Sequence, residues 1–396
     1  MKTRVVAGSL IVAAWLLYAC ASAPPPAPPA PPPAPPPPTA DQQFDALTAK
    51  YLLEFPQHSP VSATGLGDHR FDAHLDDVSA DGWQARQAFA DLYLGALDGI
   101  DRAQLSRDRQ VDALLLRNEL EQTRFSVQQL QDWRWDPLIY SRIAGNGLYT
   151  LLAREFAPAP ERLANIGRRL EEMPRFLSQV REVLDPARVP KIHAETAARQ
   201  NRGLTAMLDG EIANEVAKLP GAEQEPLRAS LARARSAIAQ HQIWLEKKLL
   251  PEAKGEFRIG AELYDRKLGF ALYSPMSRQE IRERAESELA AVHRVMYDIA
   301  REVLKGQSSR KNGNPPRMPD EPTDTQRLRV IKKALELAYA ERPKRDGVLD
   351  TARSSLEAAT QFVREKNIVT VPREPLKIIT MPEFLQHALH PQPHHP

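Results

Sequence analysis

The sequence has little cysteine, no charge bias and none of the common hydrolase motifs. It holds one cysteine in 396 residues, and 53 basic residues nearly balance 51 acidic ones. One thiol excludes an intramolecular disulfide, and a net charge of +2 gives no electrostatic reason to expect nucleic acid as a partner. Neither a His-Glu-x-x-His run nor a Gly-x-Ser-x-Gly elbow occurs, so the simplest sequence signs of zinc and serine hydrolases are absent.

Glycine is also scarce, with 18 residues, whereas apolar residues make up 42% of the chain. That apolar fraction suffices for a sizeable core and argues against global disorder. Long stretches place apolar residues three and four positions apart, which is the spacing of one face of a helix. We therefore predict a mainly α fold, an elongated multi-helix body over residues 41–384.

Helical patterns recur along most of that region and are separated by proline and glycine. The first runs from Phe44 to Phe55 and is predicted to end at Pro56 and Pro60. The others cover Trp83 to Ile100, Arg109 to Leu130, Pro160 to Leu184 with a kink at Pro174, Lys191 to Leu219, Glu225 to Leu250, Thr323 to Ala340 and Gly347 to Lys366.

The longest predicted helix runs from Arg278 to Lys305 and would be roughly 40 Å long. Ser277 and Glu280 fit a capping box at its start. Its apolar positions, mostly at alternating steps of four and three, are Ile281, Ala285, Leu289, Val292, Met296, Ile299 and Val303. We expect this stripe to be a packing face, with Leu289, Val292, Met296 and Ile299 buried.

Two kinds of segment break the helical pattern. Gly145-Asn146-Gly147 is typical of a turn. Late in the chain, Ile368 to Val371 and Leu376 to Thr380 are short β-prone runs flanked by Pro372 and Pro375. We predict one short β element near the C-terminus.

The single cysteine follows a leader-like segment. A short basic start precedes an apolar run that reaches Leu17, and Cys20 stands three residues later. This pattern resembles a bacterial lipoprotein signal, so we predict a signal peptide over residues 1–19 and lipidation of Cys20. Tyr18 departs from the small residues usual in this pattern. The alternatives are an uncleaved membrane anchor and an ordinary secretory signal with a chance cysteine.

Residues 20–40 form a proline-rich linker, with twelve prolines between Pro24 and Pro38. Such a run favours polyproline II, and at about 3.1 Å per residue it would hold the body some 45 Å from the membrane. A ligand for a proline-binding module is the alternative. Because Ala21 gives no acidic retention signal after the cysteine, we expect a lipid-anchored protein of the bacterial outer membrane that faces the periplasm.

Histidines and glycines offer no clear site. His69, His74, His193, His241 and His293 lack a second histidine at the helical spacing of a zinc site, so each is interpreted as a surface or hydrogen-bonded core residue. The Gly65-Leu66-Gly67 run follows no strand and is a weak sign of phosphate binding. Residues 385–396 form a His/Pro tail that we interpret as disordered, with a weak transition-metal site as the alternative. We assign no catalytic or metal-ligating residue.

Three segments taken together resemble domain-of-unknown-function family 885: Ala63 to Asp72, Ile259 to Tyr264 and Pro375 to Phe384. The resemblance covers about residues 41–384. That family is bacterial and often lipoprotein, and its full-length members resemble helical zinc metallopeptidases of the thimet-oligopeptidase type. In the family the third segment is followed by a His-Glu-x-x-Pro-Gly-His metal motif, which no residue here matches. Zinc is thus expected only in full-length members, and no cofactor in this chain.

The resemblance implies an envelope lipoprotein that corresponds to the N-terminal part of a zinc metallopeptidase-like protein. Such a chain would be inactive as a peptide hydrolase by itself, with the membrane and peptides as its partners. The alternative is a non-catalytic helical binding or scaffolding lipoprotein of the periplasm. A metal motif in another reading frame beyond codon 396 would favour the first interpretation.

Overall fold

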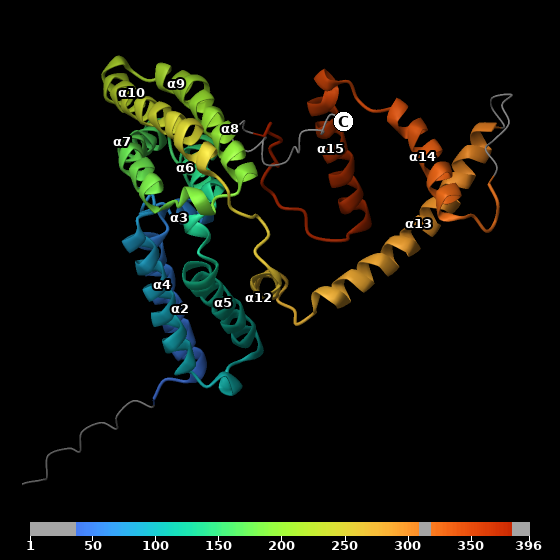
Figure 1. Cartoon of the computed structure of the whole chain (residues 1–396), viewed down its shortest axis with the longest axis horizontal. Helices are drawn as coiled ribbons and strands as arrows, with labels where there is room; N and C mark the ends of the chain where they lie inside the picture. Colours follow the sequence, from blue (N-terminus) through green and yellow to red (C-terminus); the bar gives the residue numbers. More distant parts are fainter. Residues whose placement is uncertain (1–36, 309–317, 382–396) are drawn as a thin grey trace, which may run out of the picture.

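The computed structural model describes residues 37–308 and 318–381, and most of them belong to helices (Figure 1). Within these ranges no β-strand forms, and one isolated bridge joins Pro190 to Gly255. The predicted mainly α fold is therefore confirmed. The predicted signal peptide, Cys20, nearly all of the proline-rich linker and the His/Pro tail over residues 385–396 lie outside the described residues.

The helices follow one another in the order α2 (Ala40–His58), α3 (Pro60–Leu66), α4 (Ala80–Asp98), α5 (Arg107–Phe125), α6 (Pro137–Ala153), α7 (Ala159–Val183), α8 (Lys191–Met207), α9 (Ala213–Ala217), α10 (Gly221–Trp244), α11 (Leu250–Glu252), α12 (Ala261–Leu272), α13 (Arg278–Ser308), α14 (Asp324–Ala340) and α15 (Val348–Lys366). Short π-helical turns extend α5, α8 and α10 at Ser126–Leu130, Leu208–Ile212 and Leu245–Leu249.

The body consists of two helical bundles joined end to end (Figure 1). Helices α2, α4 and α5 pack around one apolar core that includes Phe44, Tyr93 and Leu120. Helices α6, α7, α8 and α10 enclose a larger core, where Leu148, Leu170 and other side chains are fully buried. Helix α12 packs on α5, where Phe270 contacts Phe125. From α13 onward the chain forms an arm of long helices, and the segment after α15 returns to the body (Figure 1).

Helix α2 continues through Pro56, beyond the predicted end. Proline has no N–H, so the carbonyl of Leu52 loses its normal partner four residues ahead. Arg70 replaces that partner, because its Nη2 donates to the Leu52 carbonyl at 3.0 Å and its Nη1 donates to the Leu53 carbonyl at 3.2 Å. The helix then ends at His58, and Pro60 opens α3 at a first-turn position where no N–H is needed.

The prediction of a turn at Gly145 to Gly147 was wrong, because these residues lie inside α6. Glycine is required at position 147 because there is little room for a side chain, and not because the backbone needs glycine's conformational freedom. A Cβ there would lie 3.0 Å from Leu75 Cδ2 and 3.3 Å from Val61 Cγ2. The missing side chain lets α6 approach the segment that contains Leu75.

The long helix α13 was predicted correctly, and so was its capping box. Ser277 Oγ accepts from the backbone N–H of Glu280 at 3.2 Å, while the backbone N–H of Ser277 donates to Glu280 Oε2 at 2.8 Å. Helix α13 packs on α14 through a small core that joins Tyr297, Ala300 and Leu304 to two buried residues of the other helix.

The predicted burial along α13 was wrong for most of its residues. Leu289 is 55% exposed, Val292 41% and Ile299 59%, and only Met296 is partly buried. The physical reason is that α14 covers the adjacent face of the C-terminal half of α13. Apart from the partial burial of Ile281 and Met296, nothing in the described part of the chain buries the stripe that the sequence pattern identified.

The predicted short β element was also wrong. Neither Ile368 to Val371 nor Leu376 to Thr380 forms a strand, although both runs lack helical structure. A strand requires backbone partners on a neighbouring strand. Among the described residues, no backbone–backbone hydrogen bond joins either run to another segment.

Candidate functional site

The segment from Ala63 to Asp72, which carries part of the family resemblance, forms a clamp in the core rather than a phosphate-binding loop. Thr64 and Asp72 are buried, and the Thr64 hydroxyl donates to Asp72 Oδ1 at 2.6 Å. Gly67 adopts a left-handed conformation with φ of 93° and ends α3. Its backbone turns the chain so that the following residues reach the core.

Arg169 on α7 completes this clamp. It is fully buried, and its guanidinium donates to Thr64 Oγ1 at 2.7 Å and to the carbonyls of His74 and Gly147 at 2.9 and 2.5 Å. Burial lowers the pKa of Arg169 to about 10, while the nearby carboxylates of Asp72 and Asp76 favour the charged form. The guanidinium is thus charged at neutral pH and ties α3 and α6 to α7.

Arg169 was not identified from the sequence, although a signal was present. Arg169 is three residues after Ile166 and adjacent to Leu170, within the apolar stripe of α7. A charged residue on a buried helix face needs several hydrogen-bond partners. Its position therefore pointed to a polar cluster in the core, but the partners come from segments far away in sequence.

Most histidines are surface or hydrogen-bonded residues, as the sequence predicted. His69 Nδ1 lies 2.9 Å from Asp72 Oδ2, and His74 Nδ1 lies 3.0 Å from Glu172 Oε1. His193 Nδ1 lies 3.3 Å from Asp136 Oδ1 without hydrogen-bond geometry. His293 is partly buried on α13. Across residues 37–308 and 318–381, no group of three or more His, Cys, Asp or Glu side chains could hold a metal ion.

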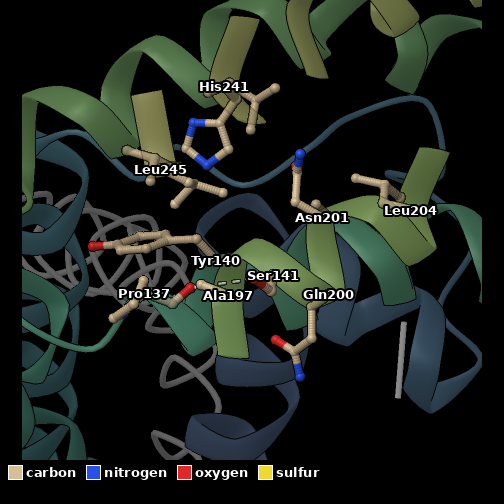
Figure 2. Close-up of a pocket in the computed structure, with 12 residues that line it drawn as sticks. Pro137, Tyr140, Ser141, Ala197, Gln200, Asn201, Leu204, His241 and Leu245 are labelled. Atoms are coloured by element: carbon tan, nitrogen blue, oxygen red, sulfur yellow. Dashed lines mark hydrogen bonds between the residues drawn. The ribbon is translucent and has the colours of Figure 1, made fainter. Parts of the chain in front are cut away.

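His241 differs, because it is buried on α10 and its Nδ1 has no hydrogen-bond partner. It faces a small cavity between α6, α7, α8 and α10, which Tyr140 and Asn201 also line (Figure 2). Burial lowers the pKa of His241 to about 3, with a smaller contribution from Arg181. The cavity measures about 20 Å³, which has room for one water molecule. It is too small for a substrate.

A much larger cleft, of about 920 Å³, lies where the chain returns to the body after α15. The ends of α6 and α7, the α9 region and residues Lys377, Ile379, Thr380 and Met381 form its walls. Its volume is in the range of natural ligand sites. The other lining residues are Tyr149, Leu152, Ala153, Glu155, Ala159, Arg162, Leu163, Glu211, Asn214, Glu215 and Lys218.

Charges of both signs line this cleft. Lys377 Nζ lies 3.1 Å from Glu155 Oε1, so this ion pair connects the returning segment to the body. Lys218 pairs with Glu215 at 2.6 Å. Arg162 donates to three carbonyls, of Leu151, Leu152 and Ala157, and so stabilises the end of α6.

This cleft is the candidate functional site, since its volume is in the range of ligand sites and exceeds those of four other pockets in the described residues, of about 20, 240, 360 and 540 Å³. From the sequence, Leu376 to Thr380 was identified only as a β-prone run, and Glu155, Arg162 and Glu211 were not identified as site residues. These residues are far apart in sequence and form no motif, so spacing alone could not have found them.

No helix of the described residues is long and apolar enough to cross a membrane. No curated protein matches the chain. A solved structure described as "a putative lipoprotein of unknown function from Shewanella oneidensis" shares the fold, with a TM-score of 0.65 and 24% sequence identity. The match covers 85% of this chain and 59% of the other, so the chain spans about three fifths of its neighbour's length. Residues 60–393 match the family described as "Bacterial protein of unknown function (DUF885)", and the chain belongs to that family.

Proposed function

We propose that the chain is an envelope lipoprotein, the N-terminal part of a zinc metallopeptidase-like protein, that binds peptides in the 920 Å³ cleft without hydrolysing them. One observation carries the proposal. The family-like segment that begins at Pro375 forms a wall of the cleft through Lys377 to Met381. The segment that resembles the family therefore borders a ligand-sized space in the described body.

Lipid anchoring is supported by the leader that ends at Cys20 and by the lipoprotein description of the structural neighbour. Lipid on Cys20 would place the body in the periplasm, on the outer membrane, at the end of the proline-rich linker. Growth with a fatty acid analogue tests this part. We expect the wild-type chain to take up label and Cys20→Ser to lose both the label and its fractionation with membranes.

The proposed lack of hydrolysis is supported by the chemistry of the described residues. A catalytic zinc needs three protein ligands and a base that reaches its water. The described residues do not fit such an ion, because no three ligand side chains converge, and the sequence lacks the family's metal motif. Zinc is assigned only to full-length members, and no step of this proposal uses it.

The activity of the purified chain tests the proposal. We expect it to bind a mixture of random octapeptides, to return them intact by mass spectrometry, and to retain no stoichiometric zinc by elemental analysis. Cleavage that a chelator stops would overturn the proposed lack of hydrolysis. Absence of any peptide binding would overturn the assignment of the cleft.

A non-catalytic scaffolding lipoprotein is the second candidate. The observation that favours it is the exposed apolar stripe of α13, where Leu289 and Ile299 are more than half exposed. A scaffold would bind its partner through this arm and not through the cleft. Charged substitutions on the stripe would then abolish partner capture while peptide binding stays unchanged.

A further inference from the structure

The segment Leu376 to Thr380 has the features of a strand without a partner. Within it, Ile378, Ile379 and Thr380 belong to residue types that favour β structure. Its backbone makes no backbone–backbone hydrogen bond among the described residues. The segment nevertheless holds a defined position, because Lys377 pairs with Glu155 on the body.

Most of this segment borders the cleft. Lys377, Ile379 and Thr380 line it, whereas Ile378 is partly buried. Residues Leu376 to Thr380 belong to no helix, and their N–H and C=O groups take part in no backbone–backbone hydrogen bond among the described residues. A stretch of unpaired backbone therefore runs along the cleft.

The opposite side of the cleft offers complementary features to a ligand. Leu152, Leu163 and Tyr149 provide apolar contacts, and Glu211 provides a carboxylate with no ion-pair partner among the described residues. Ile379 is 53% exposed, so apolar surface remains open on the segment itself. These features fit an extended peptide with alternating apolar and basic side chains.

We propose that Leu376 to Thr380 accepts an extended peptide by β-strand addition, so that the bound peptide pairs with its backbone and fills the cleft. This inference rests on the proposed function and names how the ligand is held. Main-chain hydrogen bonds would supply affinity that depends little on sequence, and the cleft walls would select alternate side chains. The β-prone run that forms no strand in this structure would become one when the ligand supplies its partner.

Proline substitutions on the full mature chain test the proposal. Ile379→Pro removes one backbone N–H and its ring blocks pairing, whereas Ile379→Ala removes only the side chain. Ile368→Pro is the matched control, because Ile368 lies in the other β-prone run and does not line the cleft. The probe is a fluorescein-labelled Val-Lys-Val-Lys-Val-Lys-Val-Lys peptide, followed by fluorescence anisotropy.

We expect Ile379→Pro to weaken binding by about tenfold or more, Ile379→Ala by less, and Ile368→Pro to leave it unchanged. Methylating alternate backbone nitrogens of the probe should cause a similar loss, since it removes donors but keeps every side chain. Unchanged circular dichroism and thermal midpoints would show that the variants fold.

The outcomes separate this inference from the proposed function. Peptide binding that survives both Ile379→Pro and backbone methylation would overturn strand addition and leave the cleft as a side-chain-based site. Absence of binding by the wild-type chain would overturn both. Slower hydrogen exchange of the Ile378 to Thr380 amides in the complex is expected only with strand addition.

Discussion

Arg169 and Thr64 are 105 residues apart in sequence, and the guanidinium of one donates to the hydroxyl of the other at 2.7 Å in the core. This hydrogen bond connects the family-like segment to α7. It extends to Asp72, which accepts from the same hydroxyl. A polar cluster of this kind is stable only while every member keeps its partners.

Removing the guanidinium should therefore be costly. Arg169→Met would leave the carbonyls of His74 and Gly147 without their guanidinium donor and Asp72 without the nearby positive charge. We expect it to lower the free energy of unfolding by about 3–5 kcal/mol. Arg168→Met is the matched control, since Arg168 is exposed next to it, and should change stability by less than about 0.5 kcal/mol. Urea unfolding measures both, and equal losses would contradict the clamp.

Gly147 gives a second test of packing. In Gly147→Ala, the new Cβ would lie 3.0 Å from Leu75 Cδ2, and we expect a loss of about 1–3 kcal/mol. Gly210→Ala is the control, because nothing lies within 4 Å of the position where its Cβ would be built. That variant should gain up to about 1 kcal/mol from reduced backbone entropy. A neutral Gly147→Ala would show that α6 is not packed closely there.

Because His241 is buried, the stability of the chain should depend on pH. The pKa of this histidine is lowered to about 3 in the folded chain, against about 6.5 when unfolded. Between these values the unfolded state binds the extra proton, so stability falls as pH falls from about 6.5 toward 3. The slope from this group is at most about 1.4 kcal/mol per pH unit.

The variant His241→Leu separates the contribution of His241 from that of the titrating carboxylates. The difference in unfolding free energy between wild type and His241→Leu should change with pH over this window and be constant above about pH 7. Denaturant unfolding at several pH values measures the difference. A difference that stays constant down to pH 4 would mean that His241 is solvated in the folded chain.

The two faces of α13 should respond differently to substitution. Leu304 is 6% exposed in the α13–α14 core, whereas Leu289 is 55% exposed. We expect Leu304→Ala to destabilise the α13–α14 pair by about 2–5 kcal/mol and Leu289→Ala by less than about 0.5 kcal/mol. Hydrogen exchange of the α13 amides reports both losses. A large effect of Leu289→Ala would show that another surface covers the stripe.

Local chemistry made the helices predictable from sequence. The start of α13 was specified by Ser277 and Glu280, and α14 and α15 begin within one residue of the predicted positions. Interactions within a few residues determine such boundaries. Leu376 to Thr380, which borders the candidate site, stood out as β-prone, but the strand predicted there does not form.

Packing between distant segments explains the failures. The periodicity of α13 identified an apolar face correctly but could not say whether another helix covers it. Gly147 was misread because its neighbour Leu75 is far away in sequence. The cleft itself requires Glu155 and Lys377, separated by 222 residues, to meet at 3.1 Å. No local pattern contains that information.

Binding of the fluorescent Val-Lys octapeptide to the mature chain, with Cys20→Ser to keep it unlipidated, tests whether the cleft binds peptides without hydrolysing them. Asn214→Trp places a large side chain in the cleft, and Gln240→Trp places the same side chain on the exposed surface of α10. We expect wild type and Gln240→Trp to bind the peptide and leave it intact, and Asn214→Trp to bind at least about tenfold more weakly. Equal affinity of all three proteins, or cleavage of the peptide, would show that the cleft is not such a site.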